Sequence, residues 1–236
     1  MPREKANKLT ILRQNDDDVV IIKPADLASE RAYGGDQSVV HMLQRQFPNH
    51  RVRLPHRLDK VTRGILLAAL SQEAIQFYNA EIQAGAWEKF YIARVHRRSR
   101  RMMQGLIGEH KAYIRREGPK ARIVHSGGKP AIIEILAHER SPVLSHDEHL
   151  LIALHTGRYH QIRCMLADLG SPLVGDDLYG GPDGRLYLEH ALLRYRDVDT
   201  QQRLAAFVRD DPGREPVSER LLDAVAELAE DLDEDY

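Results

Sequence analysis

"PHRLDKVTRGILLAAL", residues 55–70, places a cluster of charged side chains directly before an apolar run. His56, Arg57, Asp59 and Lys60 fall within five positions, and "GILLAAL" (64–70) follows. A continuous apolar run of this length is typical of a fully buried strand. Asp59 therefore stands at a strand entrance, where a carboxylate loses hydration and requires a cationic partner to stay ionised. This position suits an activated nucleophile or base; the alternative is a surface loop of alternating charges.

Charge is distributed unevenly along the 236 residues, although the formal net charge is only −1. Residues 210–236 carry 11 acids and 2 arginines, a net charge of −9. Residues 1–209 then hold 32 basic and 24 acidic side chains, a net charge of +8. A basic body of this kind can bind a polyanion, and the alternative is that its charge only keeps the protein in solution.

Five arginines lie between positions 94 and 101, in the stretch "RVHRRSRR". Because they follow a predicted strand, we expect them on an exposed loop or hairpin end. Arginines gathered in this way contact the phosphate groups of nucleic acids. The alternative is a solvated, charged turn without a ligand.

Short β-branched or alternating runs outnumber the segments with helical spacing, and the two kinds do not alternate strictly. This pattern predicts an α+β fold with a mostly antiparallel, mixed sheet and flanking helices. The expected strands are 19–24, 64–70, 87–95, 121–126, 130–139, 149–156 and 186–195; the expected helices are 38–47, 71–85, 158–170, a segment after Asp199, and 216–232.

Composition and motifs argue against several classes of protein. The single cysteine, Cys164, excludes an internal disulfide and fits a reducing, cytoplasmic setting. No apolar run approaches the roughly 18 residues of a membrane span. His56, His155 and His160 are candidate metal ligands for a metal-dependent hydrolase, but their spacing matches no common zinc motif. We therefore expect neither a metal nor a nucleotide cofactor.

The stretch "HTGRYHQIRCML" (155–166) combines a strand end with a predicted helix start. Arg158, His160 and Arg163 would lie in or near the first helical turns. Positive charge is unfavourable at a helix N-terminus unless an anion compensates it. That anion is a phosphate or Asp59 itself.

Tyr91 and Phe90 are neighbours in the predicted strand "WEKFYIARV" (87–95), so their side chains point to opposite faces. One of them can line a cleft and stack on a planar ligand. The alternative is that both belong to the core.

Three motifs, in this order, resemble those of RluA-type pseudouridine synthases. They are HRLDxxTxG at 56–64, KxYxA at 89–93, and "TGRYHQIRCMLADLGSPLVGDDLYG" at 156–180. The resemblance extends from about Asp16 to His190, most of the chain. It implies an enzyme with a central catalytic cleft that isomerises uridine in RNA to pseudouridine without a cofactor.

The resemblance also implies roles for individual residues. Asp59 matches the catalytic aspartate, Tyr91 the aromatic side chain that stacks on the target base, and Arg163 the basic residue paired with the aspartate. Arg57 matches the arginine that fills the gap left by the extruded nucleotide. The full set expected to contact RNA is His56, Arg57, Arg97, Arg98, Arg100, Arg101, Arg158 and His160.

The chain departs from its relatives at Val61 and Arg63, at Cys164 and Met165, and in "DLASE" (26–30). These departures affect substrate choice rather than the chemistry. We expect a monomer with a catalytic domain at 1–209, an acidic helical tail at 210–236 and no separate N-terminal RNA-binding domain. Its partner would be tRNA or rRNA; a catalytically silent RNA-binding protein on the same fold is the alternative.

Overall fold

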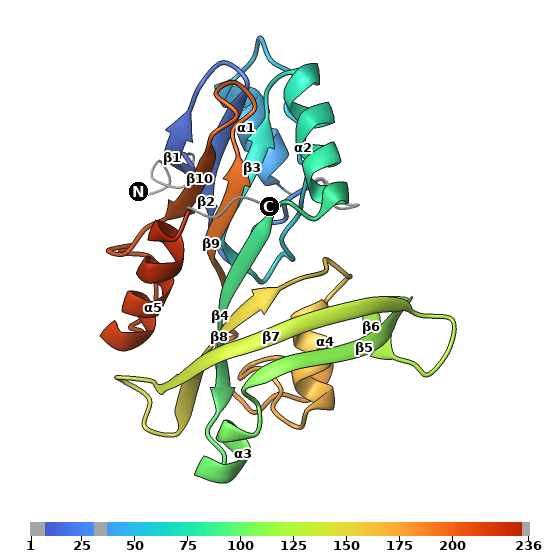
Figure 1. Cartoon of the computed structure of the whole chain (residues 1–236), viewed down its shortest axis with the longest axis vertical. Coiled ribbons are helices and arrows are strands. Elements are labelled where there is room, and N and C mark those ends of the chain that lie inside the picture. The colour runs from blue at the N-terminus through green and yellow to red at the C-terminus, as the bar shows by residue number, and fades with distance from the viewer. Residues whose placement is uncertain (1–7, 31–36, 233–236) are drawn as a thin grey trace. The chain divides into compact units, whose positions relative to one another are not determined.

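The computed structural model describes residues 8–30 and 37–232 and divides the chain into two compact units. The first unit comprises Met1–Trp87 and Leu193–Phe207, and the second comprises Glu88–Leu192 and Val208–Tyr236. Figure 1 shows the helices and strands that belong to each. The strand β9 (Leu188–Arg196) passes from the second unit into the first at residue 193.

The first unit is built on an antiparallel set of strands, β1 (Thr10–Gln14), β2 (Asp18–Lys23) and β3 (Arg63–Ala69). The end of β9 lies next to β3, and β10 (Arg203–Phe207) pairs with β9. Every residue of β3 is buried, which confirms the prediction made from the apolar run. The carboxyl end of β2 and the start of β3 meet at the Lys23–Gly64 pair, beside the charged cluster.

Two helices complete the first unit, α1 (Val39–Gln46) and α2 (Gln72–Ala84). Ser38 and Ser71 cap their N-termini, each accepting a hydrogen bond from a backbone N–H three residues later. Gly85 ends α2 in the left-handed conformation, with φ of 76°. Both helices were predicted from these caps and from the spacing of their apolar residues.

The second unit contains an antiparallel sheet with strand order β4-β8-β7-β5-β6, and the first half of β9 lies next to β4. Helix α4 contacts β6, and α5 contacts β7. The elements are β4 (Glu88–His96), α3 (Arg100–Gln104), β5 (Gly108–Glu117), β6 (Lys120–Ile123), β7 (Lys129–Arg140), β8 (Asp147–Leu154), α4 (Gln161–Asp168), the 3-10 turn η1 (Asp177–Tyr179) and α5 (Glu219–Glu230). The predicted α+β class with a mostly antiparallel sheet is confirmed.

Helix α5, the predicted acidic helix, packs on the second unit through its apolar stripe. Leu221, Leu222 and Val225 are buried, and Ser218 caps the helix by accepting from the Leu221 N–H. The last four residues of the acidic tail, 233–236, lie outside the described residues. The rest of the tail is therefore part of a folded unit.

Two expectations about secondary structure were wrong, and the strand β5 was not predicted. The segment after Asp199 is the strand β10, because pairing with β9 overrides the helical preference of "QQRLAAF". The strand β5 was missed because its polar and apolar residues are grouped, as in "EHKAYIRRE", so the sequence shows neither the alternation of a half-buried strand nor a long apolar run. Helix α4 begins at Gln161 rather than 158, since His160 has a left-handed backbone with φ of 52°.

Candidate active site

Asp59 lies in a tight turn whose neighbouring peptide groups are both held by other side chains. The Ser29 hydroxyl accepts from the Leu58 N–H at 3.1 Å and donates to the Leu58 carbonyl at 2.7 Å. The Lys60 carbonyl accepts from Lys23 Nζ at 3.1 Å. The backbone on both sides of Asp59 is thus fixed, while its own side chain is half-buried. Of its neighbours, Leu58 is buried and Lys60 is exposed.

Lys23 is a fully buried lysine beside Asp59, at the end of β2. Its Nζ also donates to the carbonyls of Pro24 at 2.8 Å and Leu27 at 2.7 Å, so all three of its protons are used. Burial lowers the pKa of Lys23 to about 8, and the negative charges of Asp26 and Asp59 oppose this shift. Lys23 is therefore a cation that interacts with Asp59 within the first unit.

His56 and Arg57 point in different directions from the same turn. His56 Nε2 accepts from the Leu67 N–H of β3 at 3.0 Å, and its ring packs edge-on against Trp87. Arg57 is exposed and pairs with Glu30 at 2.9 Å. The contacts of His56 hold the turn against β3, whereas Arg57 is accessible to a ligand. The contribution of both side chains to RNA binding stays a prediction.

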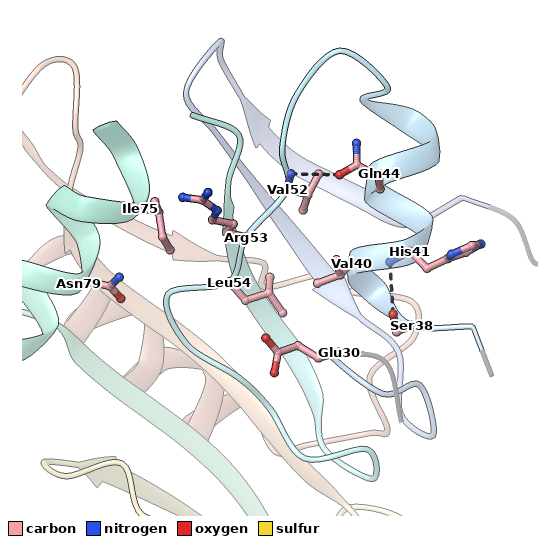
Figure 2. A pocket seen from close by; sticks show the side chains of 10 residues that line it. All are labelled: Glu30, Ser38, Val40, His41, Gln44, Val52, Arg53, Leu54, Ile75 and Asn79. Atoms are coloured by element: carbon pink, nitrogen blue, oxygen red, sulfur yellow. Dashed lines mark hydrogen bonds between the residues drawn. The ribbon is translucent and has the colours of Figure 1, made fainter. Parts of the chain in front are cut away.

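A cavity of about 560 Å³ lies in the first unit, beside the segment that leads into this turn. Figure 2 shows side chains from both helices and from residues 52–54 around it. Arg53 and His41 share its lining with Glu30, so its charge does not favour one sign of ligand. Its walls are Glu30, Ser38, Val40, His41, Gln44, Val52, Arg53, Leu54, Ile75 and Asn79.

Tyr91 belongs to β4 in the second unit and is 6% exposed. Its ring stacks on His190 of β9, with centroids 4.7 Å apart and planes 17° apart. Lys89 lies two residues earlier on the same face of the strand, and burial lowers the pKa of its amine. Phe90 points to the opposite face and is also buried, so both aromatic side chains pack within the unit.

The "TGRYHQ" segment forms a turn that Gln161 organises. The Thr156 hydroxyl accepts from the Ile132 N–H at 2.8 Å and donates to Gln161 Oε1 at 2.9 Å. Gln161 Oε1 also accepts from the Arg158 N–H at 2.9 Å, and its Nε2 donates to the Ile132 carbonyl. The Arg158 side chain donates to the Pro130 carbonyl at 2.8 Å. Arg158 thus lies before the helix, and its side chain reaches the start of β7.

Arg163 lies in the first turn of α4 and is bound by an anion that the sequence did not identify. Its Nε and Nη2 donate to the two carboxylate oxygens of Asp176, each at 2.7 Å. Both side chains are buried, with exposed fractions of 6% and 1%. A bidentate pair of this kind offsets the cost of an arginine at a helix N-terminus. The predicted pairing of Arg163 with Asp59 stays a prediction.

The predicted arginine patch divides into two kinds of residue. Arg97 lies 3.5 Å from Glu148, and the Arg98 guanidinium donates to the Gly170 carbonyl. Arg100 and Arg101 are exposed on the short helix α3, which Ser99 caps. These four arginines lie at the end of β4, with a helical turn in place of a plain loop. The expectation was wrong for Arg94, which is buried within β4 beside Asp147 and Glu215.

The histidines considered as metal ligands do not form a common site in the described part of the chain. His155 is exposed and lies 3.3 Å from Glu134, whereas His160 Nδ1 contacts the Tyr179 hydroxyl at 3.0 Å. Over residues 8–30 and 37–232, no group of three histidine, cysteine or acidic side chains is arranged to hold a metal ion. In the same residues, no helix is both long and apolar enough to cross a membrane.

These motifs match one family. A family model for RNA pseudouridylate synthases aligns with residues 17–168. The chain belongs to the RNA pseudouridylate synthase family. The RluA-type resemblance is thereby confirmed, and the protein is an RNA pseudouridine synthase, an isomerase that acts on RNA.

Two curated relatives of this pseudouridine synthase cover most of its length. It is 30% identical over 187 residues to the dual-specificity RNA pseudouridine synthase RluA of Escherichia coli strain K12, covering 78% of this chain and 83% of the relative. It is 33% identical over 184 residues to the ribosomal large subunit pseudouridine synthase D of Pseudomonas aeruginosa, covering 74% of this chain and 54% of the relative.

The solved structure of human RNA pseudouridylate synthase domain containing 1 has the same fold. It superimposes with a TM-score of 0.73 at 23% sequence identity, and the alignment covers 100% of both chains. The pseudouridine synthase fold that the motifs predicted is therefore confirmed.

Sequence reasoning missed Ser29, Lys23 and Asp176. Lys23 lies within the expected strand 19–24, and Ser29 lies within "DLASE", but neither was assigned to the site. Asp176 lies within the quoted "VGDD" segment, but nothing local marks it as the partner of Arg163. The signal in the sequence that could have identified Asp176 was its place beside Gly175 within the long motif at 156–180.

Proposed function

We propose that this pseudouridine synthase isomerises specific uridines in tRNA or rRNA, with Asp59 as the catalytic carboxylate. The support for Asp59 is the turn that holds it, since the peptide groups on both sides are bound by Ser29 and Lys23. A reactive group accelerates a reaction most when its backbone is held in position before the substrate binds. The names of the two relatives, one dual-specific and one acting on the large ribosomal subunit, support the substrate class.

The chemistry exchanges one bond at the ribose for another. The glycosidic bond from C1′ to N1 of uracil breaks, the base turns, and a bond from C1′ to C5 forms. C5 loses a proton and N1 gains one, so the composition of the RNA is unchanged. Asp59 acts as a nucleophile on the anomeric carbon or the uracil ring, or as a base at the ribose. Lys23, and Arg163 as the resemblance implies, are the cations that we assign to this carboxylate.

The target uridine must leave its stack before Asp59 can reach it, at a cost of a few kcal/mol. Arg57 fills the vacated position. We assign Tyr91 to stack on the extruded base through the ring face that is not against His190, which returns roughly 1–3 kcal/mol. The side chains assigned to hold the RNA backbone are His56, Arg97, Arg98, Arg100, Arg101 and Arg158. His160, also expected there, is not given this role because its ring nitrogens contact Arg163 and Tyr179. We place the protein in the cytoplasm as a monomer, with residues 1–209 as its catalytic domain.

Incubation of the purified protein with uridine-containing RNA tests the reaction directly. The reaction leaves the RNA mass unchanged, so the product is detected by chemical labelling of pseudouridine. We expect labelled positions in the RNA after incubation. RNA that is bound but never modified would favour the silent RNA-binding alternative. Pseudouridine maps of total RNA from cells with and without the protein would then identify the target uridine, in tRNA or in rRNA.

A further inference from the structure

The guanidinium of Arg163 is contacted by three side chains of the second unit. Asp176 binds Nε and Nη2, and His160 Nε2 lies 3.3 Å from Nη1. The ring of Tyr179 lies against the guanidinium, with its centroid 5.2 Å from Cζ. Asp176, His160 and Tyr179 are called the Arg163 cage below.

The contacts within the cage determine which nitrogen of His160 carries the proton. Arginine only donates hydrogen bonds, so His160 Nε2 must accept from Nη1 of Arg163. The proton then sits on Nδ1, which donates to the Tyr179 hydroxyl oxygen at 3.0 Å. That oxygen also accepts from the Ala121 N–H at 2.7 Å. With these contacts, the imidazole is neutral and protonated on Nδ1.

The backbone around the cage is shaped to hold these side chains. His160 has a left-handed backbone, which is costly for a residue with a side chain. Its ring stacks on Tyr159 with centroids 3.8 Å apart. A side chain at Gly175 or Gly181, on either side of Asp176 and Tyr179, would collide with backbone atoms within 2.5 Å. The local fold thus brings Asp176 and Tyr179 toward α4.

We propose that Asp176, His160 and Tyr179 are positioning residues that hold the guanidinium of Arg163 in one orientation for the isomerisation. The inference rests on the proposed function, in which Arg163 acts at the catalytic carboxylate. An arginine side chain is long and rotates freely, and a cation that turns away from its target loses most of its effect in a partly aqueous site. The cage removes that freedom before RNA binds.

The tautomer of His160 tests the cage without any enzyme assay. In protein labelled with ¹⁵N-histidine, the imidazole signal that disappears in His160→Gln belongs to this residue. We expect the neutral, Nδ1-protonated form at neutral pH, and a change in its ¹⁵N shifts in Tyr179→Phe. An Nε2-protonated or charged ring in the wild type would overturn the proposal.

The kinetic test compares each cage variant with wild type and with an Arg163→Lys background. We expect Asp176→Asn to lower kcat by about 100-fold and Tyr179→Phe by several-fold, with KM nearly unchanged, because a small misplacement of a reacting group has effects of this size. Within Arg163→Lys, the same changes should lower kcat by less than about twofold, because residues that act through a common partner are not additive.

Equal losses of kcat in the two backgrounds would overturn the proposal, since the cage would then act independently of Arg163. If Asp176→Asn does not fold, Tyr179→Phe carries the kinetic test, because it removes one oxygen and keeps the ring. A wild-type protein that forms no pseudouridine would refute the proposed function instead. The His160 measurement would still decide whether the cage exists.

Discussion

The Ser29 hydroxyl binds both polar groups of the Leu58 backbone, accepting from the N–H at 3.1 Å and donating to the carbonyl at 2.7 Å. One buried side chain therefore fixes the residue that precedes Asp59. Ser29 belongs to "DLASE" (26–30), the segment expected from the resemblance to differ from the family pattern. Ser29 thus secures the position of the turn that holds Asp59, the proposed catalytic residue.

Replacing Ser29 with alanine should loosen the catalytic turn. Two buried backbone groups of Leu58 would have no partner, so we expect the free energy of unfolding to fall by about 1–3 kcal/mol. We also expect kcat to fall about tenfold while RNA affinity is retained, because a misplaced reactive group slows the reaction. Chemical denaturation and a pseudouridine assay would measure the two effects. Ser126→Ala is the matched control, since Ser126 is exposed; equal effects from both variants would contradict the role of Ser29.

Lys23 should give the stability of the protein a distinctive dependence on alkaline pH. Burial lowers its pKa to about 8 in the folded state, from 10.5 for the ordinary side chain. Between these values the unfolded chain binds more protons than the folded one, so stability increases as pH rises. The free energy of unfolding of the wild type, minus that of Lys23→Met, should therefore rise from about pH 8 to pH 10.5. Denaturation at several pH values measures this difference, and a difference independent of pH would refute the assignment.

The arginine patch should act mainly through the two residues on α3. Arg97 and Arg98 already contact Glu148 and a backbone carbonyl, whereas Arg100 and Arg101 are exposed on the helix. Removal of one arginine–phosphate interaction reduces the dependence of log affinity on log salt by about one unit. We expect the Arg100→Gln/Arg101→Gln double variant to flatten this dependence more than the matched Arg97→Gln/Arg98→Gln variant. Titrations of RNA at several salt concentrations would show it, and an unchanged slope in both variants would remove the patch from the RNA surface.

The apolar stripe of α5 should contribute to the stability of the second unit. Leu221 is 1% exposed, and Val225 is fully buried. Leu221→Ala should lower the free energy of unfolding by about 2–4 kcal/mol, the usual cost of a cavity in a core. Glu227→Ala, an exposed change on the same helix, should have almost no effect. Similar melting temperatures for Leu221→Ala and the wild type would show that the helix is not part of the folded unit.

Local signals in the sequence were sufficient for the elements and motifs that depend on neighbouring residues. Helix α2 begins after Ser71 and ends at Gly85, as the capping preferences of serine and glycine predict. The apolar run at 64–70 forms a buried strand, also as predicted. Long-range contacts were not accessible in the same way. The segment 203–207 forms the strand β10 because it pairs with β9. Asp176 binds Arg163 because the turn at 175–181 places it beside α4.

Asp59→Asn tests the central claim most directly. The substitution keeps the size of the side chain and removes the charge that the reaction requires. Asp26→Asn is the matched control, because Asp26 also interacts with the charge of Lys23 but has no assigned role in the reaction. We predict that Asp59→Asn folds, binds RNA with near wild-type affinity and forms no detectable pseudouridine, while Asp26→Asn retains activity. Pseudouridine formation by Asp59→Asn at a rate near that of the wild type would contradict the account.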